Sequence, residues 1–138
     1  MSQSATSISF GSALPCAVDA RFDLGSLTSD GGLLWLHEAG AALGLCAALA
    51  SVIPDWRRTH VQHPIEVLIR QRIFQIAHGY EDQDDADTLR TDLLIRLVCG
   101  RLLDETDLAS QLTMSRLENH ISRRTCRDFA SGCDRWAP

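Results

Sequence analysis

The chain has 138 residues and a net charge of −5, with 45% hydrophobic and 22% charged residues. These values predict one folded domain, or one domain plus a tail, and exclude a chain that is disordered by composition. No stretch reaches the roughly 18 consecutive apolar residues of a membrane helix, and the N-terminus lacks a basic region followed by an apolar core. We therefore expect a cytoplasmic protein with no membrane partner.

The basic residues and the cysteines indicate which binding sites the chain could carry. All 13 basic residues are arginine, which forms bidentate contacts with phosphate and guanine, although a bias in genomic base composition gives the same pattern. The negative net charge excludes a purely electrostatic DNA binder, so any nucleic-acid contact must come from a local patch. The five cysteines are scattered and form no CxxC pair, which predicts free thiols rather than a zinc site.

The pattern of small, polar and apolar residues divides the chain into three parts. Residues 1–20 are predicted to be a flexible arm, although VDARFDL at residues 18–24 alternates weakly and could be extended. Residues 21–124 carry helical patterns, with breaks predicted at Gly44, Gly79 and Gly100. Residues 125–138 lack an apolar period and are predicted to be an irregular tail. The fold class is therefore all-α: a small multi-helix domain with irregular N- and C-terminal tails.

The strongest helical pattern begins at Pro64 and ends near Gly79. Pro64 suits the first turn of a helix, where its missing N–H leaves no hydrogen bond unmade. Apolar residues at steps of three and four predict a broad buried face, and Phe74 lies away from the centre of that face. The predicted buried residues are Ile65, Leu68, Ile69, Ile73, Ile76 and Tyr80, and the predicted polar surface is Glu66, Arg70, Gln71, Arg72 and Gln75.

An acidic segment, YEDQDDAD at residues 80–87, follows this helix. A calcium loop that starts at Asp82 is excluded, because its sixth position is Asp87 rather than glycine and its twelfth is Leu93. A two-metal nuclease site needs carboxylates from separate elements, which a local run cannot establish. The favoured interpretation is helix capping, since carboxylates at a helix N-terminus are stabilised by the helix dipole.

The segment LASQLTMSRLEN at residues 108–119 resembles a helix-turn-helix recognition segment in its pattern. Short polar side chains and an arginine lie near a predicted helix start, where they could reach phosphates or base edges. The alternative interpretation is a surface helix with a good N-terminal cap. The residues predicted to contact DNA are Ser110, Gln111, Thr113, Ser115 and Arg116.

Three runs together resemble a known family. They are FDLGSLTSDGGLLWLHEA, RQRIFQIAHGYEDQDDADTLRTDLLIRLVCGRL and LASQLTMSRLEN, in this order between residues 21 and 124. This part of the chain is similar to the N-terminal region of DDE transposases of the bacterial insertion-sequence 1380 type. Two positions depart mildly from that family, which usually carries proline at Leu112 and often at Leu93.

The resemblance implies an enzyme that cuts and rejoins DNA with carboxylates that hold two Mg²⁺ ions on an RNase-H-like domain. In the family the first catalytic aspartate lies on a strand downstream of the matched segment. The resemblance therefore assigns no catalytic, metal or cofactor-binding residue to this chain. After Cys126 the family leads into an amphipathic helix, whereas RDFASGCDRWAP departs from that pattern. We expect an N-terminal transposase fragment that is truncated before the catalytic core.

The partners implied are the terminal repeats of the transposon, and also full-length transposase or a second copy of the chain. One alternative is a protein–protein interaction module that pairs with or inhibits full-length transposase. A non-functional remnant of the transposase is the other.

Overall fold

The computed structural model describes residues 6–11, 13–21, 30–58, 61–102 and 106–132. Most of this part is helical, which confirms the all-α prediction, and two short strands precede the helices. The elements in chain order are β1 (Ser7–Phe10), β2 (Val18–Arg21), α1 (Gly32–Leu43), α2 (Leu45–Val52), α3 (Ile65–Ala77), α4 (Asp85–Leu89), α5 (Leu93–Val98), α6 (Gln111–His120) and α7 (Arg123–Gly132).

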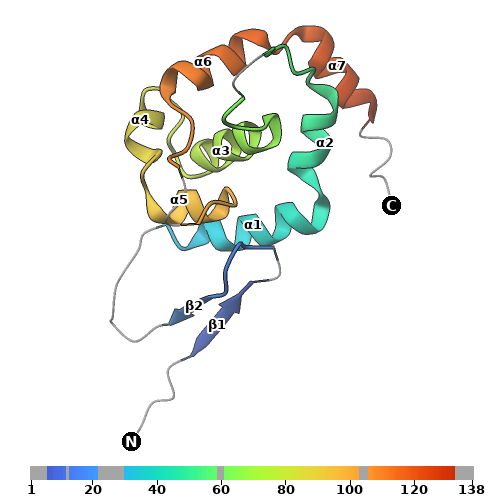
Figure 1. Cartoon of the computed structure of the whole chain (residues 1–138). Helices are drawn as coiled ribbons and strands as arrows, with labels where there is room; N and C mark the ends of the chain where they lie inside the picture. Colours follow the sequence, from blue (N-terminus) through green and yellow to red (C-terminus); the bar gives the residue numbers. More distant parts are fainter. Residues whose placement is uncertain (1–5, 12, 22–29, 59–60, 103–105, 133–138) are drawn as a thin grey trace, which may run out of the picture.

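Helix α3 lies at the centre of the helical part, and the other helices surround it (Figure 1). Two clusters of buried side chains meet at this helix. One contains Phe74 with residues of β1, α1 and α5, and the other contains Leu68 and Ile69 with residues of α6. The prediction that this helix is the centre of the core is confirmed.

The predicted buried face of α3 is wrong in part. Phe74, Gln71 and Gln75 are buried, whereas Ile76 is 48% exposed. The reason is that α3 is enclosed on several sides, so its neighbours rather than its apolar period decide which residues are covered. The side chain of Gln71 exchanges two hydrogen bonds with the backbone of Ala109, whereas the buried amide of Gln75 has no partner among the described residues.

Glycines end three helices, as the sequence predicts. Gly44, Gly79 and Gly100 have φ angles of 63°, 91° and 82°, a left-handed conformation that residues with a Cβ rarely adopt. Gly44 bends the chain by 61° between α1 and α2. No single helix in the described ranges is long and apolar enough to cross a membrane. The bent pair of α1 and α2 together has the length and the apolar composition of a membrane span, by those two criteria only.

The flexible arm predicted for residues 1–20 is wrong for the part that the structure describes. Strands β1 and β2 pair antiparallel, with Ser7 opposite Arg21 and Phe10 opposite Val18. Phe10 is buried in the core, and its ring packs edge-on against Trp35 with 5.0 Å between the ring centroids. Burial of Phe10 against residues distant in sequence orders β1, and β2 lies within residues 18–24, where the sequence pattern allows an extended segment. Residues 1–5 lie outside the described residues.

The irregular tail predicted from residue 125 is also wrong for its first part. Helix α7 continues to Gly132 and packs against α2, with Thr125 and Phe129 half-buried. The Ser122 hydroxyl accepts a hydrogen bond from the Thr125 N–H (3.2 Å) and so satisfies a free backbone donor at the helix start. Residues 133–138, which include Cys133, lie outside the described ranges.

The break predicted near residues 91–92 is confirmed, since Asp92 caps α5 by accepting a 2.9 Å hydrogen bond from the Ile95 N–H. The helix-turn-helix spacing is not found. Helix α5 ends at Val98, and residues 106–110 before α6 are not helical, whereas that motif needs a turn of three or four residues. Helix α6 therefore fits the alternative interpretation, a surface helix with a capped start.

Candidate nucleic-acid interface

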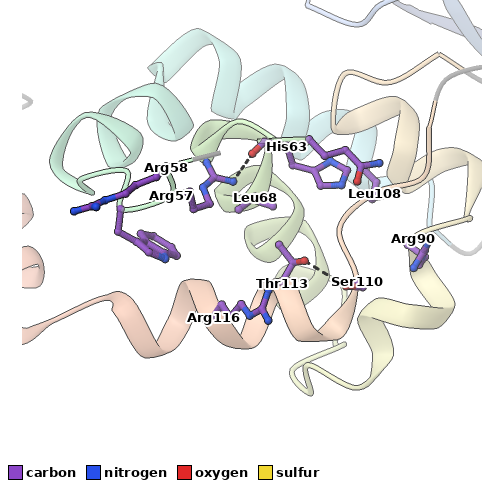
Figure 2. Close-up of a pocket in the computed structure, with 11 residues that line it drawn as sticks. Arg57, Arg58, His63, Leu68, Arg90, Leu108, Ser110, Thr113 and Arg116 are labelled. Carbon is purple, nitrogen blue, oxygen red and sulfur yellow. Dashed lines mark hydrogen bonds between the residues drawn. The ribbon is translucent and has the colours of Figure 1, made fainter. Parts of the chain in front are cut away.

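A cavity of about 510 Å³ opens between the linker before α3, the end of α4 and the start of α6. Helix α3 forms its floor through the buried Leu68. Figure 2 shows the side chains around it. The lining residues are Trp56, Arg57, Arg58, Gln62, His63, Leu68, Arg90, Leu108, Ser110, Thr113 and Arg116. Four arginines thus share one hollow in a chain whose net charge is −5.

Arg57 is held in place on the linker by two partners. Its guanidinium donates to both carboxylate oxygens of Asp55, each at 2.8 Å. It also donates to the backbone carbonyl of His63 at 2.6 Å, as Figure 2 shows. The hydrogen bond from Arg57 lowers the pKa of the Asp55 carboxyl, because it stabilises the charged form. Arg57 therefore fixes the shape of the linker, and its charge is offset by the Asp55 carboxylate.

His63 is the buried titratable group of the cavity wall, with only 7% of its surface exposed. Burial lowers the pKa of its imidazole, and the nearby positive charges of Arg101, Arg57 and Arg90 lower it further. Its Nδ1 lies 3.4 Å from a guanidinium nitrogen of Arg101, which can only donate, so Nδ1 is the acceptor. His63 is therefore neutral at pH 7 and adds no charge of its own.

Two contacts position the segment that leads into α6. The fully buried Gln71 donates to the Ala109 carbonyl at 2.9 Å and accepts from the Ala109 N–H at 3.0 Å. Arg90 at the end of α4 pairs with Asp107 at 3.1 Å. Both partners of that pair are partly exposed, and such ion pairs contribute less than about 1 kcal/mol, so a competing anion can displace Asp107.

Arg58 and Arg116 are the exposed arginines of the cavity. Within the described part of the chain neither makes an ion pair or a side-chain hydrogen bond, and Figure 2 shows them on the linker and on α6. Their guanidinium groups remain available to an anion from solvent. Close to them, the Ser110 and Thr113 hydroxyls lie 3.3 Å apart at the start of α6.

The structure separates the five residues predicted to contact DNA into two groups. Ser110, Thr113 and Arg116 line the cavity. Gln111 and Ser115 face the acidic segment instead, where Gln111 donates to Asp84 (2.9 Å) and Ser115 donates to Gln83. The two groups lie on different faces of α6, because side chains three and four residues apart share a face of a helix.

The acidic segment acts as a cap, in agreement with the favoured interpretation. Asp87 accepts a 3.0 Å hydrogen bond from the Gln111 N–H, the first residue of α6, so the capped helix is a different one from the helix that follows the segment in sequence. Glu118 on α6 pairs with Arg72 on α3.

The Mg²⁺ ions that the family resemblance implies need converging carboxylates. Among the described residues no group of three or more His, Cys, Asp or Glu could hold a metal ion, so these residues do not fit that role.

Several residues of the cavity could not be assigned to it from the sequence. Arg57 and Arg58 fit phosphate contact and a solvated loop equally well when seen in sequence alone. Nothing in sequence indicates that Arg90 and His63 belong to the same site, because the fold brings together segments that are about thirty residues apart.

Comparison with known proteins identifies a family. Residues 10–135 match the family described as transposase DDE domain group 1, which is most of the chain. No curated protein matches the chain, and no solved structure does.

Proposed function

Because the chain belongs to the group 1 transposase DDE domain family, we propose that its helical domain serves DNA transposition by binding transposon-end DNA. The observation that carries this proposal is the cavity in which Arg57, Arg58, Arg90 and Arg116 lie together. Such a local concentration of arginine in an acidic chain provides the patch that a nucleic-acid contact requires.

The residues of the cavity take different roles in this proposal. Arg58 and Arg116 are exposed and bind backbone phosphates, which set affinity and salt dependence. The Ser110 and Thr113 hydroxyls add short hydrogen bonds to phosphate or to base edges. Arg57 orders the linker, because its charge is paired with the carboxylate of Asp55.

Gln111 and Ser115, the other two residues predicted to contact DNA, help to hold α6 in place. Gln111 and Ser115 hold this helix against the acidic segment, so that the cavity face of α6 is presented to DNA.

The test is a binding titration with the terminal repeat of the insertion sequence that encodes the chain. Fluorescence anisotropy of a labelled repeat duplex is compared with that of a scrambled duplex of equal length and composition, at several salt concentrations. We expect tighter binding to the repeat and an affinity that falls as salt rises. Equal affinity for both duplexes would refute recognition of the repeat, and absence of binding would refute the proposal.

A second candidate function is pairing with another transposase chain, which the exposed side of α1 favours. Trp35 and Leu43 are 59% and 57% exposed and share a face with the exposed Ala39 at steps of four residues. Co-purification with full-length transposase that survives nuclease treatment supports this function. A Trp35→Glu variant that co-purifies equally well would contradict the involvement of this face.

A further inference from the structure

Helix α7 carries a face of arginines. Arg123, Arg124 and Arg127 are exposed and are spaced so that they lie together on one side of the helix. Thr125 and Phe129, four residues apart, are half-buried on the other side. Because α7 packs against α2, the arginine face points to solvent. The packing of α7 against α2 therefore decides which side of the helix is exposed.

These three arginines have no acidic partner among the described residues. Four arginines elsewhere make ion pairs with carboxylates, namely Arg57 with Asp55, Arg70 with Glu66, Arg72 with Glu118 and Arg90 with Asp107. Asp128 on α7 pairs with none of the three arginines of that helix, and none of the three forms an ion pair with any other described residue. Acidic residues outnumber basic ones in the chain by 18 to 13, so three exposed arginines without an ion pair on one side of α7 form a local positive patch, with Asp128 beside it.

Helix α7 follows the cavity wall directly along the chain. His120 at the end of α6 stacks on Trp56 of the cavity wall, with 3.9 Å between the ring centroids. Helix α7 begins three residues later, and Figure 1 shows it following α6 along the edge of the domain beside α2. Arg116 and the three arginines of α7 therefore belong to two helices that follow one another along this edge of the domain.

We propose that the arginine face of α7 is a second contact surface for the phosphate backbone of the DNA that the cavity binds. The proposal rests on the proposed function and adds to it a longer binding footprint. Guanidinium groups bind phosphates bidentately, and an unpaired group loses no ion pair when it does so. An anionic membrane is the weaker candidate, because the half-buried side of α7 packs against α2 and is not free to insert into lipid.

The test replaces the three arginines together, as R123Q/R124Q/R127Q, in the full chain. Each phosphate contact adds about 0.9 to the slope of log K against log salt, so the slope should fall by about 2–3 and the affinity should drop at low salt. The matched control is R123K/R124K/R127K, which keeps the charges and should keep most of the slope. Circular dichroism melting of all three proteins controls for folding.

The outcomes separate the two proposals. A parent chain that binds DNA and a glutamine variant with the same slope and affinity would overturn the role of α7 and leave the cavity intact. A parent chain that binds no DNA would overturn both. If the glutamine variant loses binding to phosphatidylserine vesicles but keeps the parent's DNA slope, the surface is a membrane contact and the proposal is wrong.

Discussion

Gln71 and Ala109 exchange two hydrogen bonds across 38 positions of sequence, one from the side-chain amide to the carbonyl (2.9 Å) and one from the N–H to the side-chain oxygen (3.0 Å). Both residues are buried. The pair joins the central helix α3 to the residue just before Ser110, where α6 and the cavity face begin. A polar side chain in the core thus sets the position of the proposed DNA-contacting helix.

A Gln71→Leu substitution is expected to lower the free energy of unfolding by about 2 kcal/mol or more. It removes both partners of the buried Ala109 peptide groups, and each unsatisfied group carries a penalty of about 1–3 kcal/mol. Gln75 provides a matched control on the same helix, since it is equally buried and its side-chain amide has no hydrogen-bond partner in the described structure. Gln75→Leu is expected to be neutral or stabilising, because it removes a buried unsatisfied amide.

Urea unfolding followed by circular dichroism measures both variants. Equal losses of stability in the two variants would show that the Gln71–Ala109 hydrogen bonds contribute nothing specific.

Two glycines should respond to alanine in opposite directions. Gly100 has a φ of 82°, and a Cβ there would meet a guanidinium nitrogen of Arg70 at 3.1 Å, so Gly100→Ala should lower stability by about 1–2 kcal/mol. Gly40 lies inside α1 with nothing within 4 Å of an added Cβ, so Gly40→Ala should raise stability by about 0.5–1 kcal/mol. Thermal melting of both variants tests this contrast, and a melting temperature that rises for Gly100→Ala would contradict it.

Stability should fall as the pH drops below about 6.5, because burial lowers the pKa of His63 from 6.5 in the folded protein. The unfolded chain then binds a proton that the folded chain resists, so stability is full above the unfolded pKa and is lost as the pH falls below it. The pKa of the buried His37 is lowered in the same direction.

The His63→Asn variant should show a smaller drop in melting temperature between about pH 7.5 and about pH 5.5, because asparagine does not titrate there. An unchanged drop would show that His63 is not the group responsible.

The features that local chemistry decides could be predicted from the sequence. Gly44, Gly79 and Gly100 end helices because only glycine adopts their φ angles without strain. The burial of Phe74 and the exposure of Ile76 could not be predicted, since they depend on which helices surround α3.

The cavity and the ends of the chain depend on the same kind of tertiary contact. Ser110, Thr113 and Arg116 were predicted from one local pattern, but their neighbours Arg58 and Arg90 reach the cavity from other parts of the chain. The pairing of β1 with β2 and the helix α7 were not predicted, because Phe10 and α7 pack against parts of the chain that are distant in sequence.

The most direct test of DNA binding by the cavity compares R58Q/R116Q with the parent chain on the terminal-repeat duplex across a salt series. Arg21→Gln is the control, because Arg21 is an exposed arginine on the hairpin, away from α6 (Figure 1). We expect the double variant to bind more weakly, with the slope of log K against log salt reduced by about 2, and the control to match the parent. A double variant that keeps the parent's affinity and slope would show that the cavity is not the DNA-binding surface.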